Sequence, residues 1–473
     1  MKELKRRNNF DERYQKLLAD LKTHLNTGVL RPGDPLQPEN WLAEHYQMSR
    51  TSVRKALDSL VEADIIVKVP GKGNYIKQIP SVSLSKETLN ICLYKPFYDQ
   101  AAVKAVFSSF ESAYQNVSIE VTEISSQTYL QDLVAMLSSD EAPDLFLLTD
   151  LHLSLLDFSE YLFDVTGCLP SGFDLERDSF APVWQPYLKE GRLYGLPVSF
   201  SPVLLAYNKD LLSRYGVSYP AAPMNWAELK RLALQLTKQE DEQAVYGFGL
   251  STTINRFSSF LMQSGFHVKA GESIDWNSEE VRKTVTFVYE MLFKDQVSPI
   301  YPASEGKMVD ELFHLGYMGI VQTTLITMNN QRKDHFNWDI AHPPYEDVKA
   351  TPVLTAGIGL NRRSNKKALS HLLLQHWLKE ETQLEWSRHT LSPPLLRAVA
   401  KEAAALPNKP DNWRLYEDIM AYGKAISEVV NPHDLQWFVD QLYPLWANIE
   451  SPRTACERIQ KEFVLKQKEV AQT

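Results

Sequence analysis

The 473-residue sequence predicts an α/β protein in which a small N-terminal domain precedes a much larger one. Length is the first indication, because compact domains average roughly 150 residues. The second is the order of periodic segments: three helix-like and two strand-like segments fill residues 1–79, whereas strands and helices alternate afterwards. Charge divides the chain at the same place. Residues 1–80 hold 14 Lys and Arg against 10 Asp and Glu, and residues 81–473 hold 36 against 49.

The composition is that of a soluble globular protein, with 44% hydrophobic and 23% charged residues. No apolar run approaches the roughly 20 residues of a membrane span. The charged start, Met1–Arg7, lacks the apolar stretch of a secretory signal. The cysteines fit no disulfide or zinc spacing and are expected to be small buried side chains: Cys92, Cys168 and Cys456. We therefore expect a cytoplasmic protein without membrane contact, metal or cofactor.

The N-terminal domain, residues 1–79, is predicted to begin with three helices. Helical spacing of apolar residues predicts the first over about 12–26 and the second over Glu39–Tyr46. Ser49 is a favourable N-cap for a third helix that runs to about Ala63. The side chains expected to be buried are Tyr14, Leu17, Leu18, Leu21, Leu25, Trp41, Leu42, Tyr46, Val53, Leu57, Leu60 and Val61.

Two short β-patterned runs follow, Ile65–Val69 and Asn74–Ile79, joined by the glycine-rich turn Pro70–Gly73. Three helices and a two-stranded wing are the plan of a winged helix-turn-helix, whose third helix enters the major groove of DNA. Arg50 and Arg54 lie one turn apart on the polar face of that helix, and arginine offers a bidentate fork to guanine.

The motifs of this domain resemble the DNA-binding domain of the GntR family of bacterial regulators. They are Gly28–Leu36, Leu42–Glu44, Ser49–Leu57 and Gly71–Ile76. The resemblance implies contacts to DNA from the recognition helix through Arg50, Thr51, Ser52 and Arg54, and from the wing through Lys72 and Gly73. Asn40 departs from the family pattern, since it stands where the family has an arginine that reaches DNA.

The remaining chain predicts a helix-covered parallel sheet. Residues 80–88 are polar, bear Pro and Ser, and are expected to form a linker. Strands and helices then alternate over Leu89–Tyr94, Ala102–Tyr114, Val117–Ile124, Tyr129–Leu137 and Asp144–Leu148. This alternation favours parallel strands with helical crossovers.

Six motifs in this region resemble the type II solute-binding proteins of transporters, the periplasmic-binding-protein-like fold. They are Ala142–Phe146, Tyr194–Pro197, Leu205–Leu211, Asn225–Leu229, Gly316–Ile320 and Ala356–Leu360. The resemblance implies an effector domain over 89–473 with lobe I at about 89–200 and 356–400, lobe II at about 205–350, and C-terminal helices over 401–473. The chain is expected to cross between lobes near Ser199–Ala206 and to return near Thr355–Leu360.

The resemblance also implies a ligand held in the cleft between the lobes, and the 11% aromatic content favours a carbohydrate. The matching positions lie after strands, on the first crossing or in the C-terminal helices, with ordinary core or surface roles as the alternative. They are Tyr94, Asp150, His152, Ser201, Gln322, Thr323 and Trp437.

These observations favour a ligand-responsive transcription regulator whose partners are operator DNA, expected to be an inverted repeat bound by a homodimer, and a small effector. One alternative is a cytosolic solute-binding protein whose head no longer binds DNA specifically, an alternative that Asn40 keeps open. Another is an enzyme with an aminotransferase-like body, which needs a Schiff-base lysine that the region of Thr324–Asp339 does not offer. Nucleophile-elbow, phosphate-loop and metalloprotease motifs are also absent, so we expect no enzyme.

Overall fold

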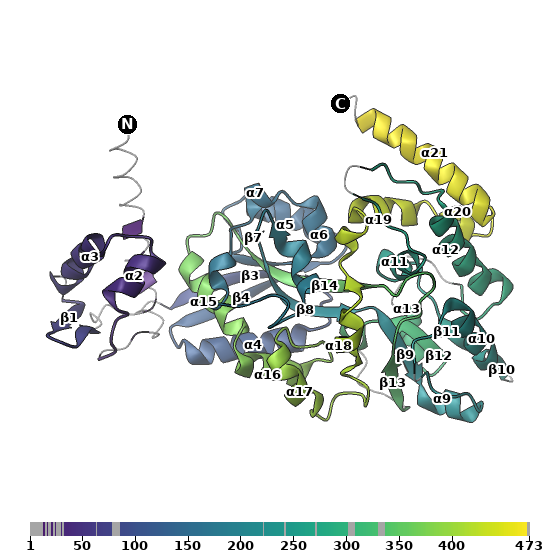
Figure 1. The fold of residues 1–473 in the computed structure, drawn as a ribbon, viewed down its shortest axis with the longest axis horizontal. Coiled ribbons are helices and arrows are strands. Elements are labelled where there is room, and N and C mark those ends of the chain that lie inside the picture. The colour runs from purple at the N-terminus through teal and green to yellow at the C-terminus, as the bar shows by residue number, and fades with distance from the viewer. Residues whose placement is uncertain are drawn as a thin grey trace.

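The computed structural model describes residues 13–14, 17, 20–21, 24, 30, 33–62, 64–77, 86–220, 222–240, 243–269, 272–300, 308–329 and 336–470. Figure 1 shows the N-terminal domain in purple, followed by two lobes that each surround a sheet. Residues 78–85, which include 80–85 of the expected linker, lie outside the described residues, while Glu87 and Thr88 of that linker begin the first strand of lobe I.

The N-terminal domain contains helices α2 (Glu39–His45) and α3 (Arg50–Glu62) and the wing strands β1 (Ile66–Val69) and β2 (Gly73–Ile76). The wing strands pair antiparallel, from Ile66 opposite Ile76 to Val69 opposite Gly73. Gly71 and Gly73 have positive φ values of 75° and 106°, which the tight turn requires and which side chains disfavour. Most of the expected helix over 12–26 lies outside the described residues, and those described within it are helical.

Two predicted core residues of this domain face solvent instead. Trp41 is 44% exposed and stacks on His45 at a centroid distance of 4.4 Å, because Leu42 and Tyr46 already fill the inner face of α2. Val61 is 37% exposed. It follows Leu60 by one residue, which turns its side chain about 100° away from the buried stripe of α3.

Lobe I is built on a six-stranded mixed sheet. Its strands lie in the order β15-β14-β5-β3-β4, with β8 also pairing to β14. Their bounds are β3 Glu87–Lys95, β4 Val117–Ser125, β5 Leu145–Thr149, β8 Leu196–Pro202, β14 Thr351–Leu360 and β15 Gly423–Lys424. The pairs β3–β4 and β3–β5 are parallel as predicted, while β14 runs antiparallel to β5. Helices α4 (Gln100–Ala113), α5 (Tyr129–Leu137), α15 (Lys367–Trp377) and α16 (Glu380–His389) contribute to its core.

Lobe II is built on a five-stranded sheet in the order β10-β11-β12-β9-β13. The bounds are β9 Leu204–Asn208, β10 Lys238–Glu240, β11 Gln243–Gly249, β12 Met318–Thr323 and β13 Trp338–Ala341. Alternate residues of β9 enter different cores: Leu204 and Ala206 join the core that continues from lobe I, whereas Leu205 and Tyr207 face a second core. That second core includes residues of α10 (Trp226–Leu236), α11 (Ile254–Gln263) and α12 (Glu279–Tyr289).

Two of the connections between the lobes correspond to the predicted crossings. Strand β8 ends at Pro202 and β9 begins at Leu204, so the first crossing lies at Val203, within the expected Ser199–Ala206. The return lies between Ala341 of β13 and Thr351 of β14, a few residues earlier than the expected Thr355–Leu360. Both crossings lie between the sheets of the two lobes, which is where a hinge is expected.

The C-terminal helices divide between the two cores. Helix α18 (Leu415–Met420) packs in the core of lobe I, whereas α19 (Pro432–Asp440), α20 (Tyr443–Trp446) and α21 (Pro452–Val470) pack on lobe II. Helix α19 also contacts α6 (Asp150–Leu155) of lobe I. The three cysteines are free and buried, as expected. Over the described ranges, none of the helices is long and apolar enough to cross a membrane.

Candidate DNA interface and inter-lobe cleft

The recognition helix begins with a satisfied N-terminus and exposed polar side chains. The Ser49 hydroxyl accepts a hydrogen bond from the backbone N–H of Ser52 at 3.1 Å, as its predicted role as N-cap requires. Arg50 and Thr51 are exposed on the first turn of α3, while Val53 is buried beneath them. This first turn therefore presents a guanidinium and a hydroxyl to solvent on a rigid, capped helix.

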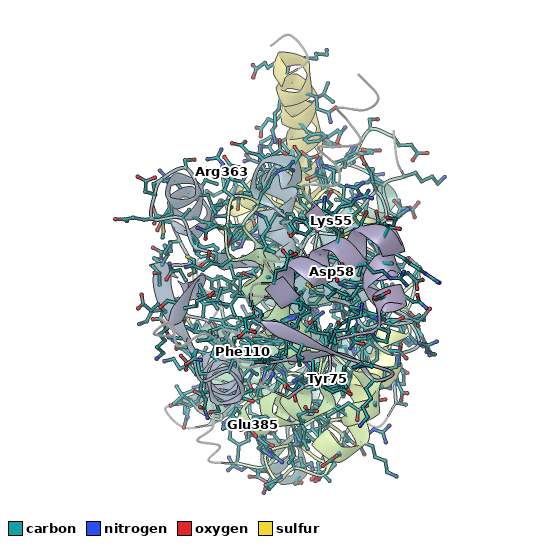
Figure 2. The ribbon with its side chains drawn as sticks, turned by 90° about the vertical axis from the view of Figure 1, so that its left-hand side faces the viewer. Lys55, Asp58, Tyr75, Phe110, Arg363 and Glu385 are labelled. Carbon is teal, nitrogen blue, oxygen red and sulfur yellow. The ribbon has the colours of Figure 1, made fainter. Side chains whose placement is uncertain are left out.

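Arg54 is held by the preceding helix. Its Nε donates to Glu39 Oε2 at 2.7 Å, yet its side chain stays 62% exposed, so the outer guanidinium nitrogens face solvent. Asn40, the residue that departs from the family pattern, is also exposed on α2. Figure 2 looks onto this domain and labels Lys55 and Asp58 on α3 and Tyr75 on the wing.

The wing places Lys72 at an exposed turn. The backbone N–H of Lys72 donates to Val69 O at 3.0 Å, which closes the turn, and Gly73 starts β2 directly after it. Arg50, Thr51, Arg54, Lys72 and Gly73 are thus all exposed, and Ser52 is half-buried through its bond to Ser49.

In lobe I, three of the predicted cleft residues lie together at the carboxyl ends of parallel strands. Tyr94 is near the end of β3, and Asp150 and His152 follow β5 in the first turn of α6. The ring of His152 lies 6.0 Å from that of Tyr94, measured between centroids. The His152 Nδ1 accepts from the Thr149 backbone N–H at 3.3 Å, which leaves Nε2 as the nitrogen that carries the proton in the neutral ring.

Burial decides the charge states in this group. It raises the pKa of the Asp150 carboxyl to about 6 and lowers the pKa of His152 to about 4. Burial also raises the pKa of the Tyr94 hydroxyl, and the nearby Asp99 adds to the effect. At neutral pH the group therefore offers one buried carboxylate, a neutral imidazole and a phenol.

Gln322 and Thr323 lie in lobe II at the end of β12, which pairs with the start of β9 beside the hinge. Thr323 donates to Asp310 Oδ1 at 2.6 Å and is therefore already engaged. Gln322 is 1% exposed, and among the described residues neither its Oε1 nor its Nε2 has a hydrogen-bond partner. A buried amide without partners is costly, so this side chain is the strongest candidate for a group that a ligand satisfies.

Ser201 serves the contact between the lobes. Its hydroxyl donates to Pro202 O at 2.9 Å and accepts from the backbone N–H of Leu325 at 2.9 Å, at the start of α14 (Leu325–Met328). Both bonds are internal to the protein. Trp437 lies on α19, which contacts α6, and its ring packs on α21: it lies 5.3 Å from the Phe463 ring and 5.1 Å from the Lys466 ammonium.

The structure adds a buried network that sequence reasoning did not identify. Asp99 accepts hydrogen bonds from Ser199, Thr390 and Ser392 of lobe I and from Asn329, which follows α14 of lobe II. Asp99 lies shortly after β3, at the edge that holds Tyr94, so its place after a strand was the available signal. Its partners come from positions far along the chain, which no local pattern connects to Asp99.

Neither surface holds a recognisable metal centre: in the part of the chain that the structure describes, no three His, Cys, Asp or Glu side chains are grouped to bind an ion. The fold and these surfaces define a two-lobed solute-binding protein that carries a winged helix-turn-helix head.

Comparison with known families agrees with that class. Residues 95–384 match the bacterial extracellular solute-binding proteins, and residues 13–76 match the gntR family of bacterial regulatory proteins. The first match spans more than half of the chain, so the protein belongs to the bacterial extracellular solute-binding protein family and carries a GntR-type DNA-binding domain.

Curated relatives include two bacterial repressors. The repressor NagR of Bacillus subtilis is 34% identical over 65 residues, which are 14% of this chain and 27% of that repressor. The repressor MngR of Escherichia coli, of a mannosyl-D-glycerate transport and metabolism system, is 35% identical over 65 residues with the same shares. The chain thus spans about a quarter of the length of these repressors.

Solved structures match the body. An ABC substrate-binding protein from Listeria monocytogenes, in complex with cycloalternan, has a TM-score of 0.72 at 21% identity, covering 81% of this chain and 99% of that one. A solute-binding protein from Thermotoga lettingae, bound with alpha-D-tagatose, has a TM-score of 0.66 at 20% identity, covering 80% and 98%. At these identities the likeness establishes the fold.

Proposed function

We propose that the protein is a ligand-responsive transcription regulator, in which solute binding between the lobes changes how the head engages operator DNA. One observation carries the proposal: the chain joins a capped recognition helix, with Arg50 exposed, to a hinged receptor whose hinge region holds the unpartnered amide of Gln322. A DNA reader and a ligand receptor in one chain are the two sites that allosteric coupling requires.

We propose a carbohydrate as the solute. Tyr94 offers an aromatic ring at the lobe I edge, and Asp150 and Gln322 offer an acceptor and an amide that hydroxyl groups satisfy. The similar solved structures include proteins with bound sugars, which supports the same solute class. The structure gives Ser201, Thr323 and Trp437 partners within the protein, so they support the site from behind or lie outside it.

Closure of the hinge is the proposed switch. A ligand that touches both lobes binds the closed state better, and it shifts the equilibrium only by that difference in affinity. Strand β2 of the head ends at Ile76 and lobe I begins with β3 at Glu87, so only a short connection separates the two. We expect the protein to act in the cytoplasm. We also expect a homodimer on an inverted repeat, because one recognition helix reads only a few base pairs.

The test is a reciprocal measurement of binding. The operator is first selected from random duplexes, and candidate sugars are screened by thermal shift, since ligand at 100 times its Kd adds ~2.7 kcal/mol. Calorimetry then measures ligand affinity with and without saturating operator, and operator affinity with and without ligand. Thermodynamic linkage requires that the operator changes the ligand affinity by the same factor by which the ligand changes the operator affinity, typically about 5–150-fold.

Two results would change the proposal. If ligand binds tightly while neither affinity responds to the other partner, the body does not switch this head. If no duplex is selected above non-specific affinity, the chain is a solute-binding protein whose head no longer reads DNA, and Asn40 is the substitution that favours this second function. Asn40→Arg then tests it by restoring specific binding.

A further inference from the structure

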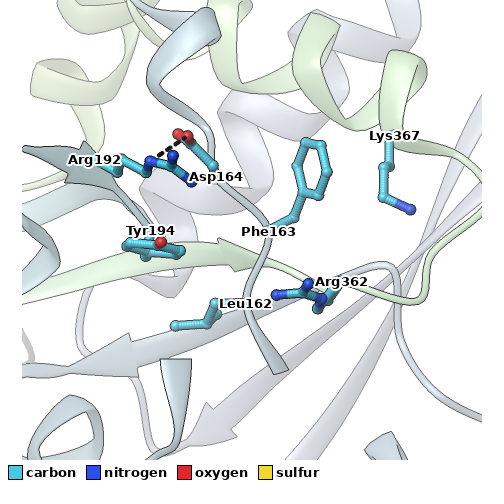
Figure 3. Close-up of a pocket in the computed structure, with 7 residues that line it drawn as sticks. All are labelled: Leu162, Phe163, Asp164, Arg192, Tyr194, Arg362 and Lys367. Atoms are coloured by element: carbon cyan, nitrogen blue, oxygen red, sulfur yellow. Dashed lines mark ion pairs between the residues drawn. The ribbon is translucent and has the colours of Figure 1, made fainter. Parts of the chain in front are cut away.

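A pocket opens on lobe I, and Tyr94, Asp150 and Gln322 are not among the residues that line it. Its volume is about 310 Å³. The residues that line it come from three separate segments of the chain and are shown in Figure 3: Leu162, Phe163, Asp164, Arg192, Tyr194, Arg362 and Lys367.

The strand register places this pocket at the edge of the sheet opposite the cleft. Leu360, at the end of β14, pairs with Leu145 at the start of β5, and Arg362 follows two residues later. Tyr94 and Asp150 instead lie at the carboxyl ends of β3 and β5. A molecule in this pocket would therefore not occupy the cleft between the lobes.

The pocket carries more positive charge than its carboxylate balances. Arg192 lies 4.0 Å from Asp164, and this pair is drawn on one side of Phe163 in Figure 3. Arg362 and Lys367 lie on the other side, and among the described residues neither has a carboxylate partner. The hydrogen bonds of their side chains go to carbonyl oxygens: Arg362 donates to Ser159 O at 2.7 Å and Lys367 donates to Ser364 O at 2.5 Å.

The two cations also act on each other. Partial burial lowers the pKa of Lys367, and the charge of Arg362 lowers it further. Helix α15 begins at Lys367 with no side-chain cap, so its N-terminal amides add to the positive potential. A bound anion would offset the repulsion between the positive charges of Arg362 and Lys367.

Aromatic side chains form the rest of the wall. The Lys367 ammonium lies 5.2 Å from the centre of the Phe163 ring, and Tyr194 packs edge-on against Phe158 at 5.5 Å. Leu162 is buried behind them. The pocket therefore joins a cationic side to an apolar, ring-lined side.

Backbone hydrogen bonds fix the three segments relative to one another. Phe163 N donates to Leu360 O and Arg362 N donates to Tyr161 O, both at 2.9 Å. Val165 N donates to Leu193 O at 2.7 Å. The lining residues are thus held in place before any ligand arrives, which lowers the entropic cost of binding.

We propose that this pocket binds a small ring-bearing phosphate ester, at a site separate from the inter-lobe cleft. Two unpaired cations match the charge of about −1.5 to −2 that a phosphate monoester carries at pH 7. The guanidinium of Arg362 donates to two phosphate oxygens, Lys367 adds a point charge, and Phe163 and Tyr194 contact the ring. The proposal goes beyond the regulator function and holds whether or not the head binds DNA.

Calorimetry on the full chain tests the proposal with glucose 6-phosphate, inorganic phosphate and glucose as probes. We expect glucose 6-phosphate to bind more tightly than inorganic phosphate, which lacks a ring. Arg362→Gln and Lys367→Gln should each weaken glucose 6-phosphate roughly tenfold or more, because a charge-assisted hydrogen bond is lost. Arg363→Gln is the matched control: it removes a neighbouring exposed arginine that does not line the pocket and should leave the affinity unchanged.

Four results would overturn the proposal. The first is no binding of glucose 6-phosphate or phosphate at millimolar concentration. The second is an equal loss in Arg363→Gln, which would mark a general effect of surface charge. The third is a loss of affinity for glucose 6-phosphate in a Gln322→Met variant, which would place this probe between the lobes. The fourth is weaker DNA binding in Arg362→Gln with unchanged affinity for glucose 6-phosphate, which would make the patch a DNA contact.

Discussion

Asn329 of lobe II donates its side-chain amide to the carboxylate of Asp99 in lobe I. Both side chains are buried, and the same amide also donates to Thr390 and Ser392 of lobe I. Asp99 keeps its hydroxyl donors, Ser199, Thr390 and Ser392, if the lobes separate, whereas Asn329 loses its partners to water. Opening at the hinge would break this contact, so we expect it to stabilise the arrangement in which the lobes meet.

Removing that amide should shift the protein towards the open state. For Asn329→Ala we expect the closed state to lose about 1–3 kcal/mol, the range for a buried hydrogen bond whose partner is left unpaired. Small-angle scattering of the ligand-free protein should show a larger radius of gyration. Asn337→Ala is the control, because Asn337 makes a similar bond to Asp210 within lobe II, at 3.1 Å. Equal radii for Asn329→Ala and wild type would show that the contact does not hold the lobes.

The unpartnered amide of Gln322 predicts that its removal keeps or raises the stability of the protein but weakens ligand binding. Gln322→Met should leave the free energy of unfolding equal or raise it by about 1 kcal/mol, since the variant no longer buries an unsatisfied group, and it should weaken the cleft ligand. Gln383 offers a matched comparison: it is equally buried at 1% exposure, but it donates to Trp377 O at 2.8 Å and accepts from Leu395 N at 2.6 Å. Gln383→Met should therefore destabilise the protein. Similar losses in both variants would mean that Gln322 has a partner.

Asp150 predicts a specific pH dependence. Burial raises its pKa to about 6 in the folded protein, so between about pH 4 and 6 the folded state binds this proton more tightly than the unfolded state does. Its contribution to stability falls as pH rises through that window, by about 3 kcal/mol, and stays lost above it. Asp150→Asn should then be more stable than wild type at pH 7 and equal below about pH 4.

Denaturant unfolding of wild type and Asp150→Asn across this range checks the effect. His152 contributes in the opposite direction, because burial lowers its pKa to about 4 and stability from this group rises with pH up to its ordinary value. Both proteins contain His152, so the difference between their curves isolates Asp150. Exposed Asp140→Asn controls for the loss of one charge, and a constant difference at all pH values would contradict the assignment.

The head predicts two separable effects on DNA. Arg50→Ala should weaken the selected operator by about 1–3 kcal/mol and relax base preference, if its fork reads guanine. Lys72→Ala should weaken specific and non-specific duplexes alike and reduce the salt slope by roughly one. Lys77→Ala is the control, since its ammonium is already paired with Asp64 at 2.5 Å. An unchanged operator affinity in Arg50→Ala, with the fold intact by circular dichroism, would exclude the groove assignment.

Assembly is the last prediction. We expect a dimer by sedimentation, free or on the operator, because a symmetric pair of heads matches an inverted repeat. A monomer in both conditions would contradict this prediction, because each chain would then bind DNA alone.

Much of the fold was predictable because local signals were strong. The helix over Tyr129–Leu137 has the predicted bounds, and the N-cap at Ser49 has the predicted hydrogen bond. The order of elements and the sequence motifs led to both families, and comparison confirmed them. Trp41 and Val61 were wrongly placed in the core, because hydrophobicity favours burial but the small head has room for only part of its apolar residues.

For the candidate ligand site, the sequence predicted the neighbours of some residues but not of others. Tyr94, Asp150 and His152 were predictable as neighbours, since the carboxyl ends of parallel strands meet at one edge of a sheet. The surroundings of Trp437 were not predictable, because the direction of a helical side chain depends on which helix packs beside it, here α21.

By itself, the sequence determined the two classes of domain and the exposed cations of the recognition helix, which depend on periodicity and on residues close together in the chain. Only the tertiary structure decided that Asn329 meets Asp99 and that Arg362 and Lys367 join Arg192 around one pocket. Those groups come from distant segments. Their proximity is set by strand register and by packing between lobes, which no local pattern encodes.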